Sequence, residues 1–178
     1  MDVLATTDLC DSNIELMESG ELRFLQPVFK TYGKREAFSG RIETLKVLDD
    51  NGLVLEALRS RGEGKVLVID GAGSMRCALM GGQLTQLAER MGWAGVVVNG
   101  CIRDVNDINE CDIGVRALAS HPVRPTKKGL GERHLPAFVA GTLILDGDWL
   151  YADADGILVS KSELSVSSDK LLSIFDFL

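Results

Sequence analysis

Two short groups of residues in the middle of the chain have the composition of an anion-binding site. The first is Gly81-Gly82-Gln83-Leu84, at the start of a helix predicted over residues 83–91. Consecutive glycines expose backbone N–H groups, and a helix N-terminus adds positive partial charge. This group could therefore hold a carboxylate or a phosphate without a cationic side chain. The alternative is an ordinary junction between two helices.

The second group is Arg103-Asp104, which follows a predicted buried strand. The guanidinium group of an arginine offers a planar fork that matches a carboxylate. The aspartate beside it offers a hard oxygen ligand for Mg²⁺, which usually keeps several waters. Together the two groups could hold a 2-oxo acid by its carboxylate and polarise its ketone through the metal. The alternative is a surface ion pair, worth less than ~1 kcal/mol.

A third glycine-rich group, Gly71-Ala72-Gly73-Ser74, also follows a predicted strand. A Gly-x-Gly pattern in that position suggests a dinucleotide site. Here, however, Arg76 occupies the place of the third glycine. The next strand ends in Asn99-Gly100 and offers no carboxylate for a ribose. A tight turn is the favoured interpretation.

The elements around these groups predict a parallel sheet. Lys65–Asp70 and Ala94–Asn99 are continuous apolar runs of the kind found in strands buried on both faces. The helix over 83–91 joins them, which predicts a right-handed parallel crossover. Ligands of open α/β sheets collect at the carboxyl ends of the strands. The two candidate groups are therefore expected at one edge of the sheet.

The remainder of the chain predicts one domain over residues 1–178. Helices are expected between Asp8 and Gly20 and over Asn51–Arg61, with a short helical piece over Met75–Met80. The second half favours a β-rich layer over further βαβ units, because its apolar runs are short and separated by Gly, Pro and Asp. The expected strands cover 113–119, 137–139, 142–145, 149–152 and 156–159, and a helix is expected over 167–178.

Composition narrows the choice of function. The 178 residues carry a net charge of -7, which argues against binding nucleic acid through its phosphates. No apolar run approaches the length of a membrane span, and residues 1–7 do not resemble a secretory signal, so we expect a cytoplasmic protein. Four cysteines without metal-ligand spacing predict free thiols. With only two histidines, a bound metal would be Mg²⁺ or Mn²⁺ rather than zinc.

The chain resembles the signature of a family with two branches, in which Gly82 is followed by twenty intervening residues and then by Arg103-Asp104. One branch holds regulators of ribonuclease activity A, and the other holds class II (divalent-metal) 4-hydroxy-4-methyl-2-oxoglutarate aldolases. The resemblance implies a swivelling α/β/β domain with a parallel βαβ core and a β-rich second half. It also implies a homotrimer. The matching segments cover most of the chain: KVLVIDGAGSMRCALMGGQLTQLA, WAGVVVNGCIRDVNDI, CDIGVRALASHPV, GLGE and GDWLYADADGILVS.

The resemblance further implies a role for each candidate residue. Backbone groups of residues 81–84 and the side chain of Arg103 would bind the pyruvyl part of a 2-oxo acid. Asp104 would bind Mg²⁺ or Mn²⁺. Regulator-type members tend to have Gln in its place, so Asp104 favours the aldolase branch. The expected reaction is metal-dependent retro-aldol cleavage to pyruvate, with decarboxylation of oxaloacetate as a side activity.

The chain departs from the aldolase pattern at one position. Aldolase members often carry an acidic residue where this chain has Gly82, and that residue helps to orient a metal-bound water. Glycine cannot do this, so either another group replaces the acidic residue here or turnover is slow. Lys127 or Lys128 could supply positive charge near the substrate, although a solvated loop is favoured for both. The alternative function is a non-catalytic inhibitor whose acidic surface masks a basic site on a ribonuclease.

Overall fold

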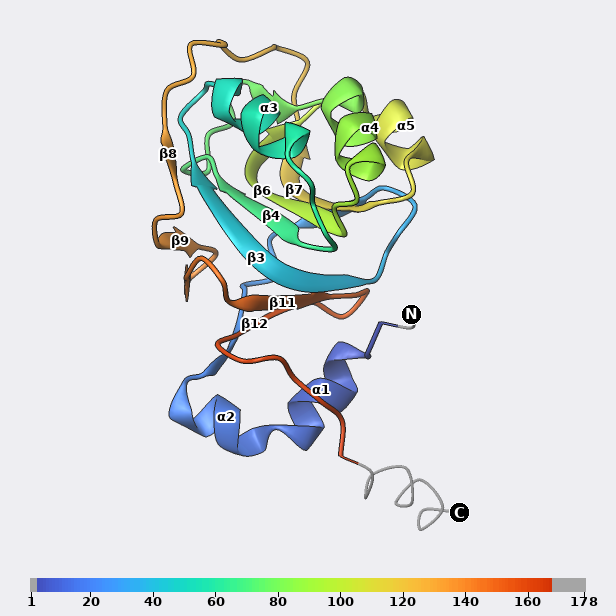
Figure 1. The fold of residues 1–178 in the computed structure, drawn as a ribbon, viewed down its shortest axis with the longest axis vertical. Coiled ribbons are helices and arrows are strands. Elements are labelled where there is room, and N and C mark those ends of the chain that lie inside the picture. Colours follow the sequence, from blue (N-terminus) through green and yellow to red (C-terminus); the bar gives the residue numbers. More distant parts are fainter. Residues whose placement is uncertain (1–2, 168–178) are drawn as a thin grey trace.

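A mixed sheet whose central strands are parallel forms the centre of the protein (Figure 1). The computed structural model describes residues 3–167, so the predicted tail helix lies outside the described residues apart from Ser167. Residues Val66 to Ile69 are fully buried, as expected for a parallel strand covered on both faces. The four central parallel strands, in spatial order, are β3 (Phe38–Lys46), β4 (Val66–Asp70), β6 (Gly95–Ile102) and β7 (Gly114–Ser120).

Antiparallel strands extend the sheet on both sides. β4 pairs with residues 42–46 of β3, and residues 149–152 near the C-terminus pair with residues 38–41 of β3. The long strand β3 therefore belongs to two layers at once. The added strands are β2 (Lys30–Tyr32) beside β7, and β11 (Trp149–Ala152), β12 (Ile157–Ser160) and β1 (Leu22–Phe24) beyond β3.

Short strands complete the fold. β8 (Glu132–Arg133) pairs with the end of β3, and β9 (Ala137–Val139) and β10 (Thr142–Ile144) form a hairpin. β5 (Ala78–Met80) pairs in parallel with the end of β6. The helical piece predicted over Met75–Met80 is therefore wrong. All three β5 residues are buried, and so short an apolar run fits a buried strand as well as a helix.

Three helices cover one face of the parallel strands: α3 (Gly52–Arg59), α4 (Gly82–Arg90) and α5 (Val105–Glu110). α1 (Thr6–Ser12) and α2 (Ile14–Ser19) lie at the opposite end of the molecule (Figure 1). The predicted crossover from β4 through α4 to parallel β6 is confirmed. A second such unit, β6–α5–β7, was not expected. α5 is only six residues long and offers no helical period of apolar side chains for a prediction.

Alternate residues of the central strands pack into two different cores. Leu67 and Ile69 of β4 face the helices α3 to α5. Val66 and Val68 face a layer built by β9 to β12. A smaller core around Leu9 joins α1 to the far side of β11 and β12. The predicted α/β/β architecture, with its parallel core and β-rich second half, is thereby confirmed.

The four cysteines are free thiols, as predicted. Burial raises the pKa of Cys101 and Cys111, and burial together with the neighbouring carboxylate of Asp49 raises the pKa of Cys77 to about 11. These thiols are protonated at neutral pH, which makes them weak nucleophiles. Within residues 3–167, no helix is both long and apolar enough to cross a bilayer.

Candidate functional site

The two anion-binding groups predicted from the sequence meet at one edge of the sheet. β5 ends at Met80 and β6 ends at Ile102, and these neighbouring strands run in parallel. The backbone N–H of Arg103 donates to the carbonyl oxygen of Met80 at 3.0 Å, which ties the two groups together. Beside them opens a cleft of about 310 Å³, bordered by Gly81, Gln83, Leu84, Arg103 and Asp104 among others.

The glycines at 81 and 82 allow the two groups to approach this closely. A Cβ atom on Gly81 would lie 2.6 Å from a carboxylate oxygen of Asp104. A Cβ atom on Gly82 would lie 2.8 Å from the Cβ atom of Asp107. Gly82 begins α4, so the junction is strand to helix rather than helix to helix. The first-turn N–H groups have no partner inside a helix, so those of Gln83 and Leu84 can serve a ligand.

The Arg103 guanidinium group reaches into the cleft and keeps much of its fork open. Its side chain is 38% exposed, and Nε lies 3.9 Å from Oδ2 of Asp104. Nη1 donates at 3.4 Å to the carbonyl oxygen of Pro122. Neither contact is a paired, bidentate interaction of the kind that would occupy the group. A carboxylate ligand could therefore take the fork.

Asp104 lies where the backbone turns from β6 into α5. Its backbone is left-handed, with φ 58° and ψ 48°, which is costly for a residue other than glycine. Its Oδ2 accepts a hydrogen bond from the N–H of Gly82 at 3.0 Å, so the carboxylate lies against the N-terminus of α4. The side chain remains 42% exposed toward the cleft.

Asp107 also borders the cleft, and the sequence analysis did not single it out. It lies on α5 three residues after Asp104, the N-cap residue of that helix, and a Cβ atom on Gly82 would lie within 3.4 Å of both side chains. A Cβ atom on Gly82 would lie 3.2 Å from Oδ2 of Asp107. The carboxylate of Asp107 thus occupies the region into which an acidic side chain at position 82 would project. The i, i+3 spacing after Asp104 is the signal that could have identified it.

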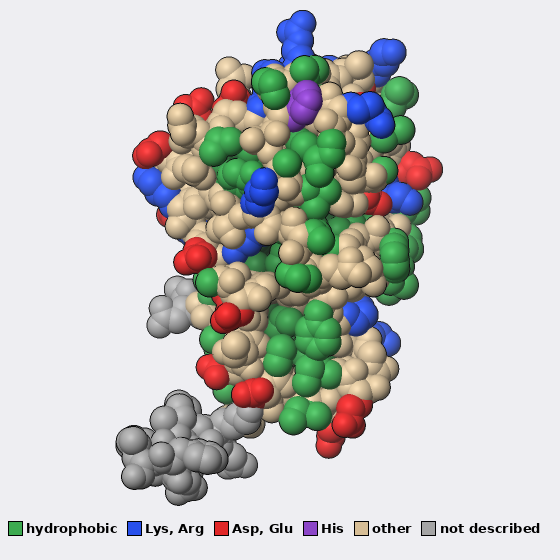
Figure 2. Space-filling model, turned by 180° about the vertical axis from the view of Figure 1, so that it is seen from behind, with side chains coloured by type: hydrophobic (Ala, Val, Ile, Leu, Met, Phe, Trp, Pro, Cys, Tyr) green, Lys and Arg blue, Asp and Glu red, His purple; other side chains and the backbone are tan. Residues whose placement is uncertain are grey.

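The loop between β7 and β8 closes the other side of the cleft with Arg124 and Lys127. Lys127 is exposed, as a solvated loop predicts, but it also borders the cleft. Lys128 is held outside, with its N–H bound to Asp50. Figure 2 shows Lys and Arg side chains gathered at this end of the molecule. The cleft holds three cationic side chains against two carboxylates, so its charge suits an anion although the chain is acidic overall.

The two carboxylates fit a hard divalent cation. The residues that the structure describes contain no cluster of three or more His, Cys, Asp or Glu side chains around a common point. Mg²⁺ is commonly held by one or two carboxylates and completes its octahedron with water or substrate oxygens. Asp104 and Asp107 form such a donor set at the border of an open cleft. A zinc site of the closed type would need more protein ligands.

Comparison with known proteins places this cleft in a family. The family model "RraA-like", described as Aldolase/RraA, matches residues 6–159. The chain belongs to the RraA-like family. The match spans both candidate groups, the α3 to α5 layer and the C-terminal strands, so the family extends over nearly all the described residues.

Named members of the RraA-like family differ in their stated function. A protein of Arabidopsis thaliana, "Putative 4-hydroxy-4-methyl-2-oxoglutarate aldolase 3", is 63% identical over 93% of this chain and 100% of its own length. The structure of "the RNA-processing inhibitor RraA" from Thermus thermophilis is 43% identical, with a TM-score of 0.86, and covers 94% of this chain and 98% of its own. A Geobacillus kaustophilus structure named as an S-adenosylmethionine: 2-dimethylmenaquinone methyltransferase is 42% identical, with a TM-score of 0.85 over 90% and 96%.

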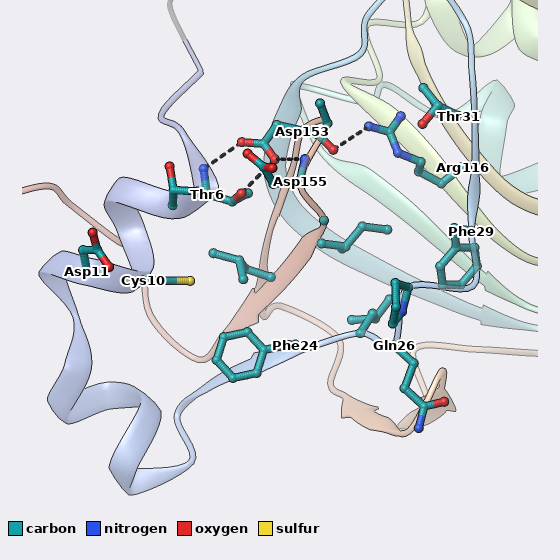
Figure 3. Close-up of a pocket in the computed structure, with 17 residues that line it drawn as sticks. Thr6, Cys10, Asp11, Phe24, Gln26, Phe29, Thr31, Arg116, Asp153 and Asp155 are labelled. Atoms are coloured by element: carbon teal, nitrogen blue, oxygen red, sulfur yellow. Dashed lines mark hydrogen bonds between the residues drawn. The ribbon is translucent and has the colours of Figure 1, made fainter.

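A second, larger cavity of about 660 Å³ lies between α1 and β12, and Figure 3 shows its lining. Its walls are largely apolar and include Phe24 and Phe29. Arg116 extends into it but is 2% exposed and donates to the backbone carbonyl oxygens of Glu36, Val115 and Asp153. Burial lowers the pKa of this arginine. None of the residues predicted to do chemistry lies in this cavity.

Asp153 lies in the turn between β11 and β12 and forms part of the wall of that cavity. Its carboxylate accepts hydrogen bonds from the N–H and the hydroxyl of Thr6, at 2.8 and 2.7 Å (Figure 3). It also accepts one from the N–H of Asp155. These contacts fasten the start of α1 to the turn between β11 and β12. Asp153 therefore has a structural role here.

Moving the acidic side chain from position 107 to position 82 tests whether Asp107 replaces the acidic residue that aldolase members often carry at position 82. Asp107→Ala is expected to lower pyruvate release about a hundredfold or more, the usual contribution of a positioned acid or base. Gly82→Asp in the Asp107→Ala background should recover about a tenth of the activity or more, because the new side chain enters the space that Asp107 leaves. Gly82→Asp alone would place its Cβ 2.8 Å from that of Asp107 and should lower stability.

Steady-state assays of the four combinations measure this exchange, with thermal melts as the control for folding. An Asp107→Ala variant that is folded and fully active would show that the carboxylate has no part in the reaction.

Proposed function

We propose that this protein is a divalent-metal-dependent aldolase that cleaves 4-hydroxy-4-methyl-2-oxoglutarate and related 4-hydroxy-2-oxo acids to pyruvate. One observation carries the proposal. The fork of Arg103, the N-terminus of α4 and the carboxylates of Asp104 and Asp107 converge on one cleft at the carboxyl ends of β5 and β6. The relative from Arabidopsis thaliana that bears an aldolase name matches over its whole length. A homotrimer and a cytoplasmic location remain predictions of the sequence.

In this proposal, the substrate binds by its two ends. The carboxylate at C1 lies in the fork of Arg103 and accepts hydrogen bonds from the N–H groups of Gln83 and Leu84. Arg124 and Lys127, on the facing wall of the cleft, take the distal carboxylate. Opposed cationic groups favour dicarboxylates and orient the bond between C3 and C4 within the cleft.

Asp104 would hold the divalent cation, with Asp107 beside it in the cleft and water completing the coordination. When bound, Mg²⁺ or Mn²⁺ supplies Lewis acidity at the ketone and carboxylate oxygens of the pyruvyl end. Asp104 is held in place for this by the N–H of Gly82. Its carboxylate also partly balances the charge of Arg103, whose Nε lies 3.9 Å away.

Cleavage needs a base at the C4 hydroxyl, and Asp107 is the carboxylate we assign to that role. It takes up the hydroxyl proton, directly or through a water, while the bond between C3 and C4 breaks. C4 becomes a ketone, and the electron pair of the broken bond remains with the pyruvyl fragment. That fragment takes a proton at C3 and leaves as pyruvate. Oxaloacetate would lose CO₂ at the same place, because its decarboxylation also leaves an electron pair at C3.

The proposal is tested by measuring pyruvate release from a panel of 4-hydroxy-2-oxo acids and oxaloacetate, with Mg²⁺, with Mn²⁺ and with EDTA. We expect release from both substrate types with either metal and loss of release in EDTA. Full activity after exhaustive chelation would refute the metal dependence. Absence of pyruvate from every compound in the panel would refute the aldolase.

A second candidate function is the inhibition of an RNA-processing enzyme through protein contacts. Two observations favour it. The Thermus thermophilis relative is described as such an inhibitor. The first 21 residues contain six acidic side chains and no Lys or Arg, and Figure 2 shows acidic side chains around an apolar patch on the lobe that carries α1 and α2. Binding of a ribonuclease by both wild type and Asp104→Ala, with no pyruvate from either, would favour this function.

A further inference from the structure

Two consecutive aspartates just beyond the end of β3 fasten the two sides of the cleft. Asp49 holds the segment that leads into β5. Its carboxylate accepts hydrogen bonds from the Ser74 hydroxyl at 2.6 Å and from Nε of Arg76 at 2.7 Å, and it lies 3.4 Å from the Cys77 sulfur. β5 then runs directly to Gly81. Asp49 therefore supports the wall that binds the pyruvyl end of every substrate.

Asp50 holds the opposite wall. It is 1% exposed, and its carboxylate accepts four hydrogen bonds. Oδ2 accepts from the Thr126 hydroxyl at 2.7 Å and from the Lys128 N–H at 2.6 Å. Oδ1 accepts from the N–H groups of Gly52 and Gly129, both at 3.0 Å. The residues on either side of Lys127 are thus bound to the same carboxylate.

The Asp50 carboxylate stays ionised in this contact. Burial by itself would raise the pKa of Asp50, but the four hydrogen bonds outweigh it and lower the pKa to about 2. Backbone contacts reinforce the attachment, because the Thr126 N–H donates to the carbonyl oxygen of Asp49 and the Asn51 N–H donates to that of Thr126. The loop around Lys127 is otherwise exposed, so Asp50 is its principal buried anchor.

We propose that Asp50 is a positioning residue that sets the reach of the cleft and thereby selects 2-oxo acids with a second carboxylate. It does so by holding Lys127 at a fixed separation from Arg103. This inference rests on the proposed function for the role of Lys127, and it adds the residue that determines specificity. Asp50 itself lies outside the cleft lining and acts only through the loop.

A binding comparison separates positioning from general support of the fold. The two probes are 2-oxoglutarate and 2-oxopentanoate, which have the same carbon chain and differ only in the distal carboxylate. Calorimetry with Mg²⁺ present gives the Kd of each. Asp50→Ala is expected to weaken 2-oxoglutarate about tenfold while changing 2-oxopentanoate little. Lys127→Ala should do the same, and the double variant should lose no more than either single variant.

Asp49→Ala is the matched contrast, since it loosens the wall that both probes share. It should weaken both by a similar factor. Asp50→Asn keeps a hydrogen-bond acceptor on one side of the side chain. It should therefore weaken 2-oxoglutarate binding less than Asp50→Ala does, and again selectively. It replaces Asp50→Ala in the comparison if that variant does not fold. Equal weakening of both probes by a folded Asp50 variant, or no weakening of 2-oxoglutarate, would overturn the inference.

Measurements on the wild-type protein test the role of Asp50 separately from the proposed aldolase reaction. Tighter binding of 2-oxoglutarate than of 2-oxopentanoate, without pyruvate release from any hydroxy-oxo acid, would refute the aldolase and leave the comparison of variants valid. Equal affinity for the two probes, or no affinity for either, would refute selection by the distal carboxylate whether or not pyruvate is released.

Discussion

Asp104→Asn should reduce metal-dependent pyruvate release about a thousandfold, the equivalent of roughly 4 kcal/mol of transition-state stabilisation. Asparagine is almost the same size as aspartate, can still accept the hydrogen bond from the Gly82 N–H, and adopts the left-handed backbone at no greater cost than aspartate does. The substitution therefore removes the negative charge and little else. Asp104→Ala would also remove the contact with the N-terminus of α4, so it is the less specific variant.

The measurement is pyruvate release over a wide range of Mg²⁺ and Mn²⁺ concentrations, with binding of Mn²⁺ followed separately by electron paramagnetic resonance. Both signals should fall together in Asp104→Asn. Asp112→Asn is a suitable control, because Asp112 is an exposed aspartate paired with Arg35. Undiminished turnover in a folded Asp104→Asn variant would contradict the assigned role.

Arg103→Ala should raise KM for the 2-oxo acid by about thirty- to a hundredfold, the cost of about 2–3 kcal/mol expected for a charge-assisted contact. The carboxylate at C1 does not change during cleavage, so this contact serves the ground state and the transition state alike. A loss of uniform binding of this kind appears mainly in KM. Arg103→Lys should give a smaller loss, because it keeps the charge but not the fork.

Initial rates for 4-hydroxy-4-methyl-2-oxoglutarate, together with the inhibition constant for pyruvate, measure this effect. Both constants should rise in parallel, since the product shares the pyruvyl end. An unchanged KM in Arg103→Ala would show that the Arg103 guanidinium group pairs with Asp104 at the surface and does not bind the substrate.

The candidate site was largely predictable because its main parts follow strands that the sequence marks clearly. Continuous apolar runs predict β4 and most of β6, and the ends of parallel strands share an edge. Arg103 and the glycines at 81 and 82 therefore had to lie close together. The edge of the cleft was set partly by β5, which the sequence analysis assigned to a helix. Its short apolar run carries no period that separates the two states.

The parts that were missed come from contacts between distant segments. Asp107 belongs to a helix too short to show a period, and its meaning depends on the absence of a side chain at Gly82. The sequence analysis considered Lys127 but favoured a solvated loop; in the structure it borders the cleft, and Asp50, far away in the sequence, binds the residues on either side of it. The i, i+3 spacing from Asp104 could have pointed to Asp107, but no local pattern shows that Asp50 holds the loop around Lys127. The family resemblance supplied the architecture that these contacts complete.

The left-handed backbone of Asp104 has a consequence for how this chain can evolve. A residue with a Cβ atom is held there against its own conformational preference, so the fold gives up stability at the position where the proposed chemistry is concentrated. Glycine would relieve that cost and remove the carboxylate in one substitution. In a descendant no longer selected for turnover, Asp104→Gly would be favoured because it would raise the stability of the fold.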